Sequence, residues 1–276
     1  MIDLHLHTNV SDGWLTPTSL VERAAAAGIR VLAVTDHDTT AGIDEATVEA
    51  ARRGLQIVPG IEITAVEHGR DVHMLGYFFD PDDDGLSRFL AAQRETRVGR
   101  IVEMAKRLQV LGMPIDVQPL IDEASRQNSK SLGRPQLARA MIAAGYVADT
   151  REAFEQWLGR DRPAFVERPG APPGEVITIV HCAGGVISLA HPGRTKIDDD
   201  IPRLRRHGLD AIEVYHSDHD GPTIDFYLQM AQRLGLLVTG GSDFHGDPQR
   251  ALEPGAACLP EPDWTKLLAR IDHARR

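Results

Sequence analysis

Short runs of β-branched and apolar residues alternate with segments of helical periodicity, and this alternation restricts the fold more than any other feature. Seven candidate strands span residues 2–7, 31–35, 56–63, 72–78, 185–190, 211–215 and 237–239. Helical patterns predict helices over 15–27, 44–53, 199–207 and 222–234, and each of these segments is followed by a glycine that can end the helix. Strand, helix and strand in this order predict an α/β fold with parallel strands.

The middle of the chain lacks this alternation. Residues 86–159 contain only helical patterns, over 86–111, 120–126, 135–144 and 151–158. The sequence therefore predicts a helical insertion at 86–159 in a main domain formed by 1–85 and 160–276, which suits a chain of 276 residues. The insertion is a candidate lid that determines substrate specificity, and packing alone is the alternative.

Charge and composition exclude several classes of protein. Thirty basic and forty acidic side chains give a net charge of -10, which argues against binding to duplex DNA or an anionic membrane. The first residues resemble a strand, so we expect no signal peptide, and no apolar run reaches the roughly 20 residues of a membrane helix. Cys182 and Cys258 are widely spaced, which fits a cytoplasmic, reducing compartment.

Histidines stand along or just after several predicted strands. His5 and His7 alternate on the first strand, so both imidazoles point to one face, close enough to share a metal ion. Asp12 follows in the turn Asn-Val-Ser-Asp-Gly and could reach the same ion. By itself, however, an aspartate in such a segment would be an ordinary turn residue.

The second and third strands end in further ionisable residues. The second ends in Thr-Asp-His-Asp, and an apolar strand does not carry three ionisable groups at its tip for stability, because burying unpaired charge is costly. His37 is the expected ligand, and Asp36 is expected to orient it or a neighbouring ligand. Glu62 lies among apolar residues and is predicted to bridge two ions, with an edge-strand charge facing water as the alternative.

Three later segments repeat the pattern. His73 lies just inside the fourth strand, His191 follows the fifth, and Asp243 and His245 follow the seventh. Six histidines and three carboxylates at successive strands are expected to converge on one mouth of a barrel, where such folds keep their active sites.

These candidate ligands exceed the needs of one four-coordinate zinc ion and suit two or three divalent ions with shared ligands. They are His5, His7, Asp12, His37, Glu62, His73, His191, Asp243 and His245. Imidazole and carboxylate ligands without thiolate favour manganese, zinc or iron. Three divalent ions against three carboxylates leave a positive pocket in an acidic protein, which predicts a phosphate site.

The same residues resemble the four motifs of the PHP superfamily (polymerase and histidinol phosphatase). The matching segments are His5-x-His7, Thr35-Asp36-His37, Glu62, His73, His191-Pro192 and Asp243-x-His245. The resemblance covers nearly the whole chain, and it implies a distorted (β/α)7 barrel similar to a TIM barrel, with three divalent ions, often Mn2+. Four features are most similar to bacterial nucleoside 3′,5′-bisphosphate phosphatases, some of whose relatives trim RNA from its 5′ end: the opening Asp12-Gly13, the strand with Glu62-Ile63, the helical insertion and the strand 212–216.

The resemblance implies metal-dependent hydrolysis of a phosphomonoester. The 3′-phosphate of a nucleoside 3′,5′-bisphosphate would leave as inorganic phosphate, and a hydroxide bridging two ions is expected to attack phosphorus. Neither cysteine lies in a nucleophile motif, and no Gly-x-Ser-x-Gly or Walker sequence occurs. Because aromatic residues make up only 5% and do not alternate with basic ones, a mononucleotide or very short RNA is expected rather than a long polymer.

Several residues outside the ligand set are predicted to act on the substrate. Arg194, three residues after His191, could grip the scissile phosphate with paired hydrogen bonds. His216 and His219, in the loop after the sixth strand, could bind substrate or protonate the leaving oxygen. The predicted catalytic residues are Asp36, Arg194 and His219. A solvated side chain is the alternative for each member of this loop and for Arg194.

A segment of the insertion resembles an anion-binding loop. Ser129, Lys130 and Arg134 stand close to a glycine just before a predicted helix. We expect them to bind a second phosphate, such as the 5′-phosphate of a nucleotide. A polar loop between two helices is the alternative.

Two other functions remain open. A histidinol-phosphate phosphatase, or another small phosphomonoesterase, would make Lys130 and Arg134 dispensable. A non-catalytic metal-binding regulatory module would tolerate the loss of ligands, whereas this chain retains every one of them. No obligate protein partner is evident from the sequence.

Overall fold

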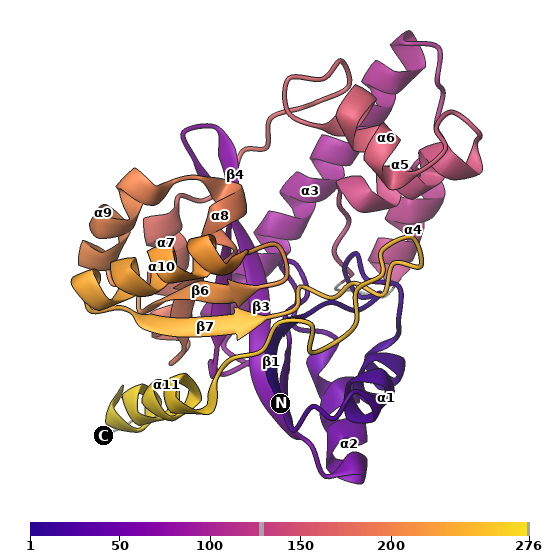
Figure 1. Cartoon of the computed structure of the whole chain (residues 1–276). Coiled ribbons are helices and arrows are strands. Elements are labelled where there is room, and N and C mark those ends of the chain that lie inside the picture. The colour runs from indigo at the N-terminus through magenta and orange to yellow at the C-terminus, as the bar shows by residue number, and fades with distance from the viewer. Residues whose placement is uncertain (127–129, 275–276) are drawn as a thin grey trace.

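The computed structural model describes residues 1–126 and 130–274, and its seven strands form one sheet in chain order. The strands are β1 (Ile2–Leu6), β2 (Val31–Val34), β3 (Gln56–Glu67), β4 (Arg70–Tyr77), β5 (Val186–Leu189), β6 (Ala211–His216) and β7 (Leu237–Gly241). Leu6 forms a parallel bridge with Phe244, and the Asp243 amide donates to the carbonyl of His5 over 2.9 Å. The sheet is thus nearly closed (Figure 1), and the predicted α/β barrel of seven strands is confirmed.

Close approach of the two sheet edges requires a glycine. A Cβ atom on Gly241 would lie 2.3 Å from the backbone nitrogen of His5, a distance that real Cβ contacts do not show. The glycine therefore lets the first and last strands meet next to His5 and His7.

One strand corrects the prediction of parallel pairing. β4 pairs antiparallel with both β3 and β5, whereas the other neighbouring strands are parallel. His68 and Gly69 both have positive φ, 49° and 68°, as the central residues of a two-residue hairpin turn require. The turn joins β3 and β4 directly, so the two strands are longer at the hairpin than the sequence pattern indicated.

Helices connect the strands and pack on the outside of the sheet (Figure 1). The predicted helices appear as α1 (Pro17–Ala26), α2 (Ile43–Arg53), α9 (Ile201–Arg206) and α10 (Gly221–Leu234), and the short α8 (Pro192–Thr195) follows β5. Among the described residues, three α-helices lie outside the predicted set, namely the short α8, α7 (Pro173–Cys182) and α11 (Glu261–Ala274). The Val-Ile-Thr-Ile-Val run of α7 has strand-like composition, although Pro173 in its first turn is typical of a helix start. Within the described ranges, no helix is both long and apolar enough to cross a membrane.

The middle of the chain forms a helical block. It contains α3 (Asp84–Val110), α4 (Gln118–Arg126), α5 (Arg134–Ala143), α6 (Thr150–Ala153) and the π-helical turn η1 (Phe154–Leu158). Ile101, Met104, Leu137 and Met141 belong to a hydrophobic cluster of this block that is separate from the barrel core. In Figure 1, α5 and α6 lie away from the sheet, and α3 runs from the barrel into the block.

A buried ionic cluster attaches α3 to the barrel. Asp38 follows β2, and its Oδ2 atom lies 2.5 Å from Arg97 Nε on α3 and 3.3 Å from Arg168 Nη2. Burial alone would raise the pKa of Asp38, but Arg97 and Arg168 hold it below its usual value. Arg94 also donates to the Asp38 carbonyl, over 3.0 Å. Both the charge and the backbone of Asp38 therefore anchor the helical block.

Asp38→Asn is expected to destabilise the protein by about 3–5 kcal/mol, because two guanidinium groups would lose their shared carboxylate at a buried position. Urea unfolding followed by circular dichroism measures the change. Glu253→Gln, which breaks the exposed pair with Arg23, is the matched control and should change stability by no more than about 1 kcal/mol. Equal effects of the two substitutions would contradict the anchoring role.

Candidate metal centre and substrate cavity

All nine predicted ligands come together at one end of the barrel. His5 on β1 and His7 directly after β1 both point into the cluster, and β3 and β4 present Glu62 and His73 from the adjoining hairpin. The remaining ligands lie on the segments that follow strands, namely Asp12, His37, His191, Asp243 and His245. Because β4 runs opposite to its neighbours, His73 reaches this end from within the strand rather than from its carboxyl end.

Glu62 lies at the centre of the cluster. Its Oε2 atom lies 3.2 Å from His7 Nε2 and from His37 Nδ1. Its Oε1 atom lies 2.8 Å from His73 Nδ1 and 3.1 Å from His191 Nε2. Burial alone would raise the pKa of Glu62, but the surrounding histidines, first His37 and His73, hold it well below its usual range. A carboxylate with donors on both oxygens is suited to bridge two cations.

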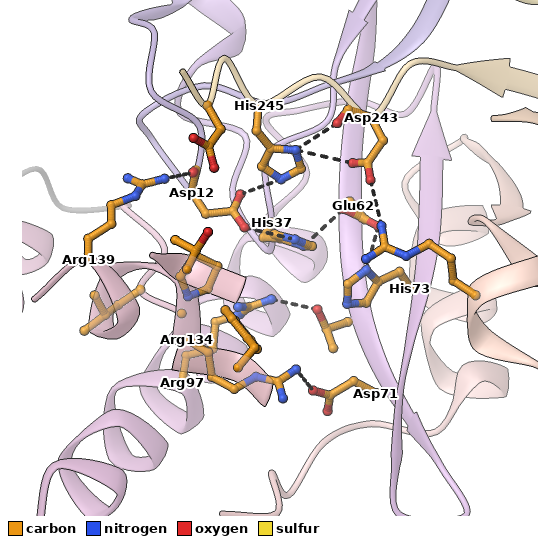
Figure 2. A pocket seen from close by; sticks show the side chains of 18 of the residues that line it. Asp12, His37, Glu62, Asp71, His73, Arg97, Arg134, Arg139, Asp243 and His245 are labelled. Carbon is orange, nitrogen blue, oxygen red and sulfur yellow. Dashed lines mark hydrogen bonds and ion pairs between the residues drawn. The ribbon is translucent and has the colours of Figure 1, made fainter. Parts of the chain in front are cut away.

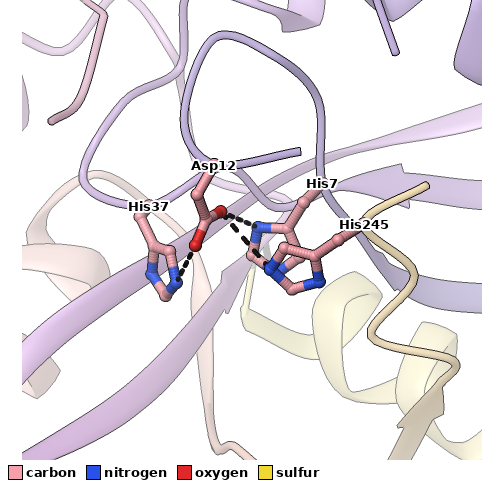
Figure 3. A group of neighbouring side chains, drawn as sticks. All are labelled: His7, Asp12, His37 and His245. Carbon is pink, nitrogen blue, oxygen red and sulfur yellow. Dashed lines mark ion pairs between the residues drawn. The ribbon is translucent and has the colours of Figure 1, made fainter. Parts of the chain in front are cut away.

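Asp12 is the carboxylate of a second group of donors (Figure 3). Its oxygens lie 3.6 Å from His7 Nδ1, 3.6 Å from His37 Nε2 and 3.3 Å from His245 Nε2. Figure 3 shows the three imidazoles turned toward the Asp12 carboxylate from separate segments of the chain. This loop aspartate thus joins ligands from both ends of the sequence.

Asp243 is the carboxylate of a third group. Its Oδ1 atom lies 3.4 Å from His5 Nε2 and 3.2 Å from His7 Nε2, and its Oδ2 atom lies 3.4 Å from His216 Nε2. Burial would raise the pKa of Asp243, but His5 and His245 hold it well below its usual range. His7 contributes to all three groups and is therefore the most shared imidazole of the centre.

Unsatisfied ring nitrogens test whether these residues fit metal ions. Six buried imidazole nitrogens among the described residues make no hydrogen bond of suitable geometry, although carboxylate oxygens lie 3.2–3.6 Å from five of them: His5 Nε2, His7 Nδ1, His7 Nε2, His37 Nδ1, His191 Nδ1 and His216 Nε2. Leaving such groups unpaired costs free energy, whereas coordination of a cation would satisfy them. Buried imidazoles and carboxylates within 4.8 Å of one another form several groups of three or four donors. The residues therefore fit divalent metal ions.

Glu213 is a site residue that the sequence analysis did not select. Its side chain is fully buried on β6, where Oε1 lies 2.9 Å from His5 Nδ1 and Oε2 accepts from the His191 amide over 2.8 Å. A carboxylate on the second ring nitrogen orients a ligating histidine. Like Glu62, Glu213 lies within an apolar run, Ala-Ile-Glu-Val-Tyr, and this position was the sequence signal that could have identified it as a site residue.

Asp36 is bonded to the loop that carries Asp12. Its carboxylate accepts hydrogen bonds from the Thr8 amide over 2.7 Å, from Thr8 Oγ1 over 2.5 Å and from Ser11 Oγ over 2.6 Å. These bonds hold the loop that carries Asp12, and Ser11 Oγ also donates to Asp12 Oδ1 over 3.2 Å, so Asp36 contacts the surroundings of this neighbouring ligand rather than His37. A catalytic role for Asp36 stays a prediction, and its contacts favour a positioning role.

The two predicted substrate histidines lie behind the centre. His216 belongs to β6 rather than to the following loop, and it is buried beside Asp243. His219 Nδ1 lies 2.8 Å from the Val214 carbonyl, and Nε2 accepts from the Gly193 amide over 3.3 Å. Both ring nitrogens of His219 are engaged, and neither histidine is among the described residues that line the cavity. These positions do not favour substrate contact or proton transfer by either residue.

The predicted anion-binding loop is only partly brought to the site. Ser129 lies outside the described residues. Lys130 pairs with Glu123 over 2.6 Å and is not among the described cavity-lining residues. Arg134 does line the cavity, at the start of α5, and pairs with Asp71 over 3.2 Å. Arg194 lines it from α8, half-exposed, with Nη1 3.2 Å from Asp243 Oδ2.

Strained backbone occurs where strands deliver functional side chains. Asp38, His191 and Asp243 have φ values of 50°, 26° and 54°, in a region that non-glycine residues rarely adopt. Each follows a strand of the barrel. Such strain persists only where the surrounding structure enforces it, and it is concentrated at functional sites.

A cavity of about 1050 Å³ lies between the metal-ligand cluster and the helical block (Figure 2). Its described lining includes eight arginines, namely Arg97, Arg100, Arg134, Arg139, Arg151, Arg168, Arg194 and Arg250. Apart from the ligand carboxylates, four acidic residues line it, namely Asp71, Asp149, Glu155 and Asp247. This excess of positive charge in a chain of net charge -10 favours an anionic substrate.

Divalent metal is expected to bind to this centre, with about three Mn2+ ions per chain, because the ligand set exceeds the needs of one ion. Elemental analysis after dialysis measures the content. Glu62→Gln should weaken metal binding by more than about tenfold, whereas Glu155→Gln, in the same cavity but outside the ligand set, should retain wild-type content. Unchanged metal content in a folded Glu62→Gln variant would contradict the central role of Glu62.

Comparisons with known proteins agree with this site. A family model described as PHP domain matches residues 3–145. The 3′,5′-nucleoside bisphosphate phosphatase of Chromobacterium violaceum is 34% identical over 98% of this chain and 97% of its own length. The 5′-3′ exoribonuclease of Haemophilus influenzae is 34% identical over 88% of this chain and 89% of its own. The crystal structure of a proposed metal-dependent phosphoesterase from Bifidobacterium adolescentis is 35% identical and has a TM-score of 0.88, covering 97% of this chain and 95% of that one. The predicted membership is confirmed: the chain belongs to the PHP domain family.

Proposed function

We propose that this PHP-family phosphoesterase removes the 3′-phosphate from nucleoside 3′,5′-bisphosphates, leaving a 5′-mononucleotide and inorganic phosphate. Short 5′-phosphorylated RNA is a second substrate class within the proposal. The names of two relatives, a bisphosphate phosphatase and an exoribonuclease, support a substrate that carries a phosphate besides the scissile one. The observation that carries the proposal is the arrangement of arginines across the cavity from the metal-ligand cluster.

Four arginines share two aspartates on this side of the cavity, and Figure 2 labels Arg97, Arg134 and Asp71 of this group. Arg100 Nη1 and Arg134 Nη2 lie 3.0 and 3.2 Å from the same oxygen of Asp71. Arg97 and Arg168 likewise share Asp38, as described above. Counting four guanidinium groups against two carboxylates leaves two positive charges uncompensated.

The excess charge is concentrated on buried or half-buried guanidinium groups. Burial lowers the pKa of Arg134 to about 10, and the neighbouring Arg100 contributes in the same direction. Burial also lowers the pKa of Arg168 to about 10, with Arg97 contributing. The Arg100 Nη2 atom has no hydrogen-bond partner among the described residues. A second phosphate of the substrate would offset this charge and supply the missing acceptor.

The residues of the opposite side would serve the scissile phosphate. Bound divalent ions supply Lewis acidity to phosphoryl oxygens and lower the pKa of water. Glu62, Asp12 and Asp243 with their histidines would hold these ions. Arg194 is half-exposed beside Asp243, so its guanidinium can turn toward a phosphoryl oxygen and donate two hydrogen bonds.

Phosphate release with added Mn2+ tests the substrate class. The panel is adenosine 3′,5′-bisphosphate, 3′-AMP, 5′-AMP, histidinol phosphate and a 5′-phosphorylated dinucleotide. We expect the bisphosphate to exceed 3′-AMP in kcat/KM by roughly 10- to 100-fold, because hydrogen bonds to charged groups contribute about 1.5–3 kcal/mol. Preference for histidinol phosphate would overturn the substrate proposal, and no release from metal-loaded protein would favour the regulatory alternative.

Arg134→Ala is expected to remove most of the preference for the bisphosphate. KM for adenosine 3′,5′-bisphosphate should rise by roughly 10- to 100-fold, while the constants for 3′-AMP change little, because 3′-AMP lacks the second phosphate. Arg151→Ala is the matched control, since Arg151 lines the same cavity but is exposed on α6. Lys130→Ala tests the anion-binding loop predicted from the sequence. A rise in KM for the bisphosphate in Lys130→Ala but not in Arg134→Ala would place the second phosphate at that loop instead.

A further inference from the structure

Trp14 is an exposed aromatic side chain at the wall of the substrate cavity. Seven large hydrophobic side chains are exposed in the described part of the chain: Met1, Trp14, Val48, Val110, Leu111, Tyr146 and Phe226. Among these seven, only Trp14 lines the cavity, with 44% of its surface exposed. An indole exposed inside a charged site can be used by a ligand, since it offers a flat apolar surface.

The backbone of Trp14 is fixed to the metal-ligand cluster. Its amide donates to the carbonyl of His245 over 2.8 Å. The preceding Gly13 amide donates to the Thr8 carbonyl over 2.8 Å, and a Cβ atom on Gly13 would lie only 2.6 Å from the His7 carbonyl oxygen. Trp14 is therefore held at a constant position, two residues after Asp12.

The ring of Trp14 is also fixed. The guanidinium carbon of Arg139, on α5, lies 4.5 Å from the centre of the indole. Arg139 donates in turn to the carbonyl of Asp12, toward which Figure 2 shows it directed. A cation over one face orients the ring, and the 44% exposure leaves the rest of the indole available to the cavity.

Phe154, another aromatic residue of the described lining, is in a different situation. Arg134 covers it, with the guanidinium carbon 5.5 Å from the ring centre, and the ring packs against the core of the helical block. Phe154 thus supports the arginines rather than offering a free face.

We propose that Trp14 binds the nucleobase of the substrate by stacking, which makes it a residue that selects nucleotides over sugar phosphates. This inference rests on the proposed function, because it supplies the third contact of the same substrate. The metal-ligand cluster would receive one phosphate, the arginines that share Asp38 and Asp71 the other, and Trp14 the base. A single stacking surface suits one nucleotide, whereas tracking a long strand needs a series of such surfaces.

The test compares adenosine 3′,5′-bisphosphate with 1-deoxyribose 3,5-bisphosphate, which keeps both phosphates and lacks the base. Because stacking changes affinity by about 5- to 150-fold per base, Trp14→Ala should raise KM for the nucleotide by that factor. This rise in KM should be confined to the substrate that carries a base. Trp14→Phe, which keeps an aromatic face, should restore most of the affinity for the nucleotide. Phe226→Ala, at an exposed aromatic residue outside the described cavity lining, is the control.

An equal rise in KM for both substrates, or no rise for either, would overturn the stacking role of Trp14. Tryptophan fluorescence gives a second readout that needs no turnover. Adenosine 5′-phosphate should quench the tryptophan fluorescence of the wild-type protein. It should not quench the fluorescence of Trp14→Phe, which retains Trp157 and Trp264. Equal quenching of the two proteins would also overturn the stacking role of Trp14. Failure of the proposed function can be told apart from failure of the stacking role. If the proposed function is wrong, the wild-type enzyme hydrolyses neither bisphosphate, whereas fluorescence quenching still reports whether a base binds at Trp14.

Discussion

The site depends on the approach of the two ends of the sheet. The Leu6–Phe244 bridge and the bond from the Asp243 amide to the His5 carbonyl bring ligands from opposite ends of the sequence within reach of one another. Without this pairing, His5 and His7 would face Glu62 but not Asp243. Gly241 is essential to the closure, because any side chain there would meet the backbone of His5.

The same closure explains why so many ionisable groups can be buried together. Each carboxylate of the ligand set lies among imidazoles. Burial alone would raise the pKa of these carboxylates, and the neighbouring histidines oppose that effect by favouring the charged form. Buried ring nitrogens without partners remain, and these are the atoms that cations would satisfy. The protein therefore carries a cluster whose electrostatics favour metal binding, as its membership of a family of metal-dependent phosphoesterases requires.

The helical block is connected to function through its attachment to the barrel. Arg97 of α3 pairs with Asp38, and Arg168 links Asp38 to Gln93 of α3. Both arginines also line the cavity beside the pair formed by Arg100 and Arg134. The ionic cluster that contributes to stability thus creates the positive wall proposed to receive a second phosphate. Docking of the block and recognition of substrate would depend on the same charges.

The sequence by itself determined the α/β class, the helical middle of the chain and the set of candidate ligands. Strand periodicity and residue type are local properties, so His5-x-His7 or a lone Glu62 in an apolar run can be read directly. Only the tertiary structure decided the direction of β4, the contacts of Asp36 and the sharing of Asp38 by Arg97 and Arg168, which stand 59 and 130 residues away. It also decided that Trp14 lines the cavity while Lys130 does not. Contacts between distant residues depend on how the elements pack, and no local pattern encodes that packing.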